Sequence, residues 1–437
     1  MHFKKLTFLL TILLCSLLLS CSGKKKKRGH TRVSIQEING KYSILKNGKI
    51  FSIKGASGYT NLAELHKRGG NSIRIWDTTH VDQILKDANA NGISVIVGLP
   101  IPESQYLSYY DNKNKVSRDF IKIKSLVNRL KSNPAILMWC VGNELVFPNK
   151  PSYNNFYKAF NDIVDMIHVD DPDHPITTTM VNFQKNEIVN IRARTNVDVI
   201  SFNIFSRITE LKDDLENFSW FWKGPYLITE WGIDGPWKGH PGTAWEAKTE
   251  PSSTLKAKNY LSRYKAYMPL QDPRYLGSFI FFWGQKQEIT HTWFSLFDEF
   301  GNKTEAVSSA EEIWKGKPSV FIGPKIKEIS ISGKIAINNI LVGPGVPLDA
   351  VIQCTGNPTD FVIKWEIYLE DWFKKNNVNN LVRPQKLEGL IIEETGFKVK
   401  FKTPNTEGPY RLFVTVLDAK GNLATANIPF YVITSND

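Results

Sequence analysis

Cysteines, clustered metal ligands and glycine-rich phosphate loops are scarce in this chain of 437 residues. There are four cysteines, with no CxxC pair and no Cys/His cluster, and the histidines show no metal-binding spacing. We therefore expect neither a metal ion nor a cofactor. Cys140 and Cys354 fall in what we interpret as two different domains, so we expect two buried free thiols instead of a disulfide.

The positive charge of the chain gives little support for nucleic-acid binding. The formal net charge is +12, and part of it is one basic run at 24–28. The remaining surplus is spread out, without a basic helix or alternating basic and aromatic residues, so we expect no nucleic-acid partner. With 42% hydrophobic and 12% aromatic residues, the chain can bury a sizeable core and offer rings that stack on sugars.

An apolar run near the N-terminus predicts export. It covers 6–19, follows two lysines, and is short for a membrane-spanning helix. It ends in Leu-Leu-Ser-Cys at 18–21, which resembles the box of bacterial lipoproteins and implies cleavage before Cys21 and lipidation of Cys21. Plain secretion, with Cys21 incidental, is the alternative. We expect a signal peptide over 1–20, a tether over 21–33, and a membrane-anchored protein of the bacterial cell envelope.

From about Ser34, short apolar stretches alternate with amphipathic helical patterns, which predicts a parallel sheet. A doubly wound sheet fits less well, because the turn from Gly55 to Gly58 lacks the spacing of a phosphate-binding loop. Eight strands, each followed by a helix, predict an α/β fold, the (β/α)8 TIM barrel, over 34–316. The expected strands are 51–55, 72–76, 93–99, 135–139, 175–180, 197–203, 225–230 and 276–283.

Beyond Lys317 the pattern changes to short strands with a period of two. About 110 residues of this alternation predict an all-β, immunoglobulin-like sandwich over 318–437. Trp365 must pack there without an intersheet disulfide, because Cys354 is the lone cysteine of this region. We expect the domain to support the barrel or act as a spacer, since no exposed aromatic row is evident; glycan binding is the alternative.

Polar side chains stand at the predicted C-terminal ends of the barrel strands, where active sites of this fold lie. Strand two ends near Arg74, strand four in Asn143 and Glu144, strand six in Asn203, and strand seven in Glu230. Hydrolysis of a glycosidic bond needs a pair of carboxyl groups: one protonates the leaving oxygen, and the other attacks the anomeric carbon or activates water. Each glutamate alone is equally compatible with a structural ion pair.

Two strand-end segments resemble the signature of glycoside hydrolase clan A, which includes the barrel domain of family 2 and the cellulase-like family 5. They are Gly-Asn-Glu at 142–144 and Thr-Glu-Trp-Gly at 229–232. The segment 281–288 is similar to bacterial β-glucan-degrading barrel enzymes, some of which carry a C-terminal immunoglobulin-like domain. The resemblance covers roughly 50–315. It implies that Glu144 is the acid/base, that Glu230 is the nucleophile, and that Asn143 binds the sugar 2-hydroxyl. Retention of configuration follows if the carboxylates lie about 5–5.5 Å apart.

The resemblance also places Arg74 beside Glu230, where a cation keeps a carboxylate ionised, and Trp283 under the reacting sugar as an apolar platform. Arg74 could equally be a structural partner, and tryptophans in a barrel are often plain packing. Further candidate substrate-binding residues are Asn203, Trp231 and Gln285, together with Trp237 and Trp293 for stacking on more distant sugars.

One departure from the clan pattern concerns strand six. Many clan members place a tyrosine near its end against the nucleophile, and this chain has Phe205 there. Tyr59 or another group takes that role, or none does.

The sequence therefore predicts a monomeric, lipid-anchored retaining β-glycoside hydrolase that acts on a polysaccharide or oligosaccharide, with a β-glucan as the expected substrate. A glycan-binding surface lipoprotein with an inactive barrel is an alternative of a different class. A transglycosylase that uses the same two glutamates is a variant of the first reading.

Overall fold

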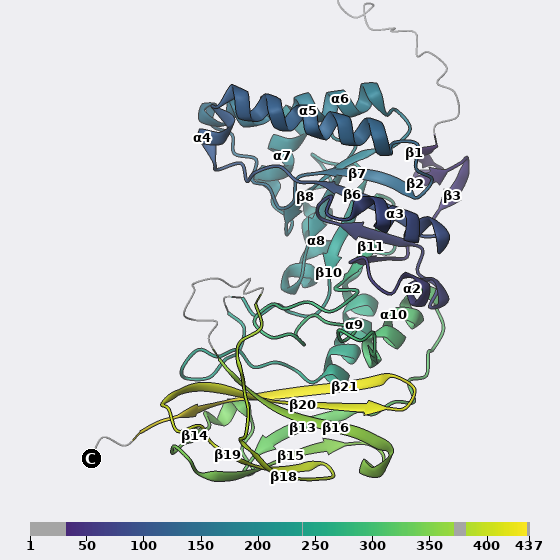
Figure 1. Ribbon diagram of the computed structural model, residues 1–437. Coiled ribbons are helices and arrows are strands. Elements are labelled where there is room, and N and C mark those ends of the chain that lie inside the picture. Colours follow the sequence, from purple (N-terminus) through teal and green to yellow (C-terminus); the bar gives the residue numbers. More distant parts are fainter. Residues whose placement is uncertain (1–31, 238, 371–381, 435–437) are drawn as a thin grey trace, which may run out of the picture.

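The computed structural model describes residues 32–370 and 382–434, apart from 238. Its two large parts are a helix-covered barrel and, below it in Figure 1, a pair of β-sheets formed by the C-terminal third of the chain. The predicted signal peptide, Cys21 and the predicted tether up to residue 31 lie outside the described residues, and the tether ends one residue earlier than predicted because Val33 begins a strand. Within the described part of the chain, no helix is long and apolar enough to cross a membrane.

Eight parallel strands close into a barrel, which confirms the predicted TIM-barrel fold. The strands are runs of buried residues, apart from Val181 at the end of β8 and Tyr275 at the start of β11, as expected where helices cover the outside and side chains fill the inside. In chain order the strands are β4 (Gly55–Ser57), β5 (Ser72–Ile75), β6 (Ser94–Leu99), β7 (Ile136–Val141), β8 (Ile176–Val181), β9 (Val199–Asn203), β10 (Tyr226–Trp231) and β11 (Tyr275–Phe281).

Helices surround the barrel, and some of them begin or end at residues that suit helix termini. The side chain of Asn112 accepts a hydrogen bond from the backbone of Lys115, 3.1 Å away, and so caps the first turn of the longest of them, α5. Gly316, at a φ of 67°, ends the last one, α10. The helices are α2 (Leu62–Lys67), α3 (Val81–Ala90), α4 (Leu107–Tyr110), α5 (Lys113–Leu130), α6 (Asn154–Asp170), α7 (Lys185–Arg194), α8 (Leu211–Asn217), α9 (Ser253–Tyr267) and α10 (Glu305–Lys315).

The segment before the barrel forms a separate sheet that the sequence did not reveal. Strands β1 (Val33–Ile38), β2 (Lys41–Lys46) and β3 (Lys49–Phe51) pair antiparallel. Backbone bonds from Val33 to Asp173 and from Tyr42 to Pro273 attach this sheet to the chain just before β8 and β11. It therefore covers the end of the barrel opposite the mouth. The prediction of a first barrel strand at 51–55 was wrong at its start, because Phe51 belongs to β3 and the barrel strand begins at Gly55.

The C-terminal part is a β-sandwich, as predicted. One hydrophobic cluster contains Trp365 and Leu412 from one sheet and Ile352 and Phe401 from the other, so the sheets pack face to face. The first sheet has the order β12 (Lys303–Thr304), β21 (Asn422–Val432), β20 (Gly408–Asp418), β16 (Phe361–Leu369) and β17 (Lys386–Leu387), with β14 (Leu341–Val342) beside β21. The second has the order β13 (Ile326–Ile331), β15 (Pro347–Cys354), β19 (Lys398–Lys402) and β18 (Ile391–Thr395).

The barrel and the sandwich share secondary structure. Strand β12, from the segment that follows the last barrel strand, pairs with β21 of the sandwich. Cys140 and Cys354 are both free thiols, as predicted, but only Cys140 is fully buried. The prediction that both thiols are buried was therefore wrong for Cys354, which is half-buried.

Candidate active site

Glu144 follows β7 in a tight turn at the barrel mouth. Gly142 and Glu144 both have positive φ, 72° and 54°. A Cβ atom on Gly142 would lie 2.3 Å from the side chain of Leu145, so any other residue there would have to displace Leu145 as well as adopt a positive φ. A non-glycine residue at positive φ is uncommon and tends to occur at functional sites. The backbone N–H of Glu144 donates to Oγ1 of Thr179, 2.9 Å away, which ties the turn to β8.

Glu230 stands at the end of β10, where it accepts bonds from three donors. Arg74, on β5, forms a buried ion pair with Oε1 of Glu230, as the sequence predicted. The indole nitrogen of Trp76 lies 2.7 Å from the same oxygen. The amide of Asn203 lies 2.9 Å from it. Such a set of donors suits a carboxylate anion, because charge-assisted bonds are the strong ones.

Asn203 connects the two glutamates. Its Nδ2 lies 2.9 Å from Oε1 of Glu144 and 2.9 Å from Oε1 of Glu230. The hydroxyl of Thr229 donates to Oδ1 of Asn203 over 2.8 Å, which fixes the orientation of the amide. Because both bonds end on one nitrogen, those two carboxylate oxygens lie at most about 5.8 Å apart, twice 2.9 Å. The glutamates of strands four and seven do converge.

Asn143 is held through its carbonyl oxygen. Oδ1 accepts from Arg74, from the hydroxyl of Thr179 at 3.2 Å and from Asn203 at 3.3 Å. Its Nδ2 makes no hydrogen bond to any residue that the structure describes. That donor is therefore available to a hydroxyl group of a bound ligand.

The two glutamates differ in their surroundings. Glu230 is 6% exposed, whereas Glu144 as a whole residue is exposed at the rim of the mouth. The carboxyl of Glu144 nevertheless lies among protein groups. Its burial there, followed by the negative charge of Glu230, raises the pKa of Glu144 above its ordinary value, although Asn203 and Arg74 act in the opposite direction.

Aromatic rings form one wall of the mouth. Trp76 stacks on Phe282, with ring centroids 5.6 Å apart, and meets Phe281 edge to face at 5.9 Å. Phe205 packs edge to face against Trp237 at 5.0 Å. Trp76, Phe282 and Trp237 are only partly buried, so these rings are the ones that can contact a sugar.

Two tryptophans that were predicted to bind substrate, Trp231 and Trp283, have buried side chains, so these predictions were wrong. Trp231 is 0% exposed and packs against Tyr260 and Tyr264, since successive strand residues point to opposite faces and Glu230 takes the inward face. Trp283 is also 0% exposed and packs against Phe297 and Trp314.

Two further predictions are corrected. Trp293 is 1% exposed, and its indole nitrogen donates to the backbone oxygen of Asp234 over 3.0 Å, so it stabilises a loop and presents no face to a distant sugar. Gln285 lines a hollow of about 170 Å³ between the loop after β11 and the sandwich, away from Glu230. Trp237 remains at the mouth, partly exposed.

The group that donates to Glu230 in place of a tyrosine is Trp76. Tyr59 is 47% exposed, while Phe205 lies against other rings. The strand pattern contained a signal for Trp76: it is two residues after Arg74 on β5, and residues two apart share a face. Thr179 was missed, because it is the last of three consecutive threonines on β8 and the sequence does not show which of them faces the site.

No group of three or more histidine, cysteine, aspartate or glutamate side chains in the described ranges is arranged to hold a metal ion.

An eight-stranded barrel with glutamates at the ends of its fourth and seventh strands is the arrangement of the clan A glycoside hydrolases. The model of one family in particular, "Glycosyl hydrolases family 2, TIM barrel domain", matches residues 79–236. The resemblance noted in the sequence is thereby confirmed over these residues, which include five of the eight barrel strands. No curated protein matches the chain.

Solved structures with the same fold include three bacterial β-glucuronidases. The enzyme of Faecalibacterium prausnitzii has a TM-score of 0.51 at 15% identity, covering 66% of this chain and 53% of its own. The enzyme of Bifidobacterium dentium, complexed with coumarin-3-O-glucuronide, has a TM-score of 0.52 at 17% identity, and the match covers 66% of this chain and 50% of that enzyme. The enzyme of Bacteroides uniformis has a TM-score of 0.50 at 11% identity, and the match covers 92% of this chain and 48% of that enzyme. This chain thus spans about half the length of these enzymes.

Proposed function

We propose that this chain is a retaining β-glycosidase that hydrolyses the O-glycosidic bonds of a β-linked glycan. The observation that carries the proposal is the shared amide of Asn203, which limits the facing oxygens of Glu144 and Glu230 to at most about 5.8 Å, twice 2.9 Å. Retaining enzymes separate their carboxyl groups by about 5–5.5 Å and inverting enzymes by about 6.5–9.5 Å, which leaves room for a water molecule.

The reaction has two steps. In the first, the Glu144 carboxyl donates its proton to the glycosidic oxygen while Glu230 forms a bond to the anomeric carbon, and the bond to the leaving group breaks. In the second, Glu144 takes a proton from water, the water oxygen bonds to the anomeric carbon, and Glu230 leaves as a carboxylate. The raised pKa of Glu144 favours the protonated form that the first step needs.

Arg74, Asn143 and Trp76 serve the same reaction. Arg74 and Trp76 donate hydrogen bonds to Oε1 of Glu230 and so stabilise its carboxylate form before each turnover. Asn143 offers its free Nδ2 to the hydroxyl next to the anomeric carbon. Trp237 and Phe282 supply apolar faces for neighbouring sugars.

The substrate that we propose is a β-glucan, and the experiment is a screen of β-glucans, mannans and galactans with the wild-type chain and with Glu230→Gln. We expect released sugars from the wild type and none from the variant, with unchanged circular dichroism. Near-normal activity of Glu230→Gln would contradict the assignment. An activated aryl β-glycoside that gives no burst would favour a binding protein, and products longer than the substrate would indicate a transglycosylase.

We also propose that Cys21 carries a lipid and anchors the enzyme to a membrane of the cell envelope. The Leu-Leu-Ser-Cys box and the basic run after it support this proposal. Fractionation of cells that express the wild type or Cys21→Ala tests it. We expect the wild type in the membrane fraction and the variant outside it; equal distribution would contradict the proposal.

A further inference from the structure

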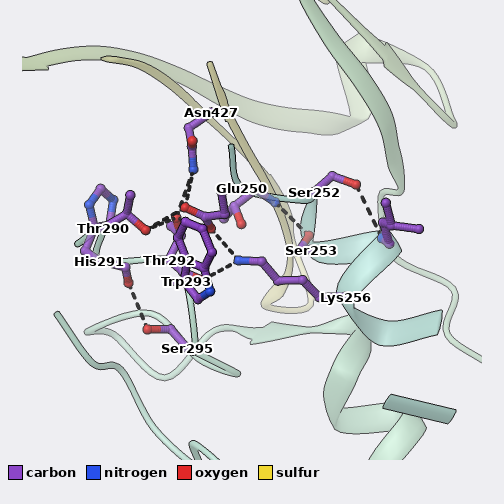
Figure 2. A network of polar contacts seen from close by, with 12 residues as sticks. Glu250, Ser252, Ser253, Lys256, Thr290, His291, Thr292, Trp293, Ser295 and Asn427 are labelled. Atoms are coloured by element: carbon purple, nitrogen blue, oxygen red, sulfur yellow. Dashed lines mark hydrogen bonds and ion pairs between the residues drawn. The ribbon is translucent and has the colours of Figure 1, made fainter. Parts of the chain in front are cut away.

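A buried polar network joins the barrel to the sandwich (Figure 2). At its centre is Glu250, in the loop after β10, with a side chain that is 1% exposed. It pairs with Lys256 at the start of α9 and accepts the hydroxyls of Thr290 and Thr292, at 2.6 and 2.8 Å. The amide of Asn427, on β21 of the sandwich, donates to it over 2.6 Å. The network thus ties two loops of the barrel to one strand of the other domain.

Asn427 is itself held from inside the sandwich. Arg411, on β20, donates to Oδ1 of Asn427 over 2.7 Å and pairs with Glu370 at 2.5 Å. The same guanidinium donates to the backbone oxygen of Lys248 over 2.8 Å, in the loop before Glu250. Buried charges are stable only when they are paired and hydrogen-bonded, so each of these contacts depends on the others.

The loop anchored by this network carries side chains to the barrel mouth. Glu288 and Thr290 exchange backbone hydrogen bonds of 3.1 and 2.7 Å. Ile289 between them has a φ of 62°, a conformation that a β-branched residue adopts only when its surroundings impose it. The hydroxyl of Thr290 is the point where Glu250 holds this turn. The position of Glu288 therefore depends on the anchor.

Glu288 lies beside the acid/base. It is 4% exposed, and Nζ of Lys286 is 3.4 Å from its carboxyl. Burial first, and also the charge of Glu144, raises the pKa of Glu288. Glu288 is therefore paired with Lys286 and lies within the electrostatic influence of Glu144.

Lys286 extends the same loop toward the nucleophile. Its Nζ lies 6.0 Å from the ring centroid of Phe282, which stacks on Trp76. Trp76 in turn donates to Glu230. A displacement of the loop would therefore disturb both sides of the reaction site.

We propose that Asn427 of the sandwich domain is a positioning residue, which fixes, through Glu250, the loop that carries Lys286 and Glu288 to the mouth of the barrel. The kinetic part of this inference rests on the proposed glycosidase function, whereas the ordering of the loop does not. The sandwich is then a working part of the site, because one of its side chains completes the support of a loop that lines it.

The test compares full-length wild type with Asn427→Ala, using steady-state kinetics on an oligosaccharide and hydrogen exchange of the amides at 284–293. We expect Asn427→Ala to raise KM about tenfold with a smaller change in kcat, and to speed exchange at 284–293 about tenfold. Thr290→Val removes the same anchor from the barrel side and provides a second variant if the first does not fold. The double variant is expected to show less than the sum of the single effects, because both act through Glu250.

Lys325→Met is the matched control. Lys325 pairs with Glu305 over 2.8 Å at the same domain junction but touches neither loop. We expect wild-type kinetics and wild-type exchange at 284–293 from it. Unchanged exchange in Asn427→Ala, or faster exchange with unchanged kinetics, would overturn the proposal. If the wild type hydrolyses no glycoside, the proposed function fails and the exchange at 284–293 alone decides whether Asn427 positions the loop.

Discussion

The indole nitrogen of Trp76 lies 2.7 Å from Oε1 of Glu230, the oxygen that also accepts a hydrogen bond from Arg74. The guanidinium of Arg74 also lies 4.9 Å from the centroid of the Trp76 ring. The three side chains form one connected unit at the ends of β5 and β10, in which Arg74 and Glu230 are buried and Trp76 is partly exposed. In this chain the indole N–H of Trp76 supplies a donor to Glu230, and the ring of Phe205 supplies none.

Trp76→Phe is expected to reduce kcat/KM by about 10- to 100-fold, because it removes a hydrogen bond to a charged group and keeps the ring. Steady-state kinetics on an aryl β-glycoside measures this change. Thermal unfolding provides the control, since the stacking on Phe282 is preserved. A variant with wild-type kcat/KM would show that the bond does not serve the nucleophile.

Asn203→Ala is expected to move the basic limb of the pH–activity profile to higher pH. The amide of Asn203 lowers the pKa of Glu144, so its loss raises that pKa further, and the acid then keeps its proton to higher pH. The profile of kcat/KM reports this group in the free enzyme. A basic limb that stays in place or moves to lower pH would contradict the assignment of Glu144 as the general acid.

Glu144→Gln is expected to stabilise the fold at neutral pH. The folded pKa of Glu144 is raised, so the folded state binds the proton more tightly, and stability falls as pH rises from the unfolded pKa through the folded one. Glutamine carries no charge, so the variant does not lose this stability at neutral pH. We expect its melting temperature to be higher than that of the wild type by on the order of 1–3 °C. The gain should vanish below the ordinary pKa of a carboxyl group. An equal gain at acidic pH would point to a cause other than this proton.

Trp283 and Trp237 are expected to behave oppositely when each is replaced by alanine. Trp283→Ala should cost about 3–5 kcal/mol of unfolding free energy, because the ring is fully buried against Phe297 and Trp314. Trp237→Ala should cost less stability and raise KM for oligosaccharides several-fold. Denaturant unfolding and steady-state kinetics measure the two quantities. Matching profiles for both variants would contradict the placement of Trp237 in the mouth.

Strand count, strand order and the two glutamates could be predicted from the sequence, because a barrel strand buried on both faces is a continuous apolar run and ends at the mouth. The fates of the tryptophans could not. Trp231 and Trp283 lie next to predicted site residues in the chain, but the side on which a ring packs depends on the helices outside the barrel. Asn203 was predicted as a substrate ligand; its bonds to both glutamates depend on distances across the barrel.

The role of the sandwich was equally hidden in the sequence. Glu250 and Asn427 are 177 residues apart, and no local pattern connects them. Only the folded arrangement brings them together beneath the loop that carries Glu288. The alternation in the strands predicted the domain, whereas the contact that joins it to the barrel required the structure.

The anomeric configuration of the first product tests the central claim most directly. Proton NMR of a fresh reaction with a β-glycoside shows the anomer that forms before mutarotation. The pairing of Glu144 and Glu230 on one amide predicts that the β-anomer appears first. An α-anomer as the first product would contradict the account, because it requires a water molecule between the two carboxylates.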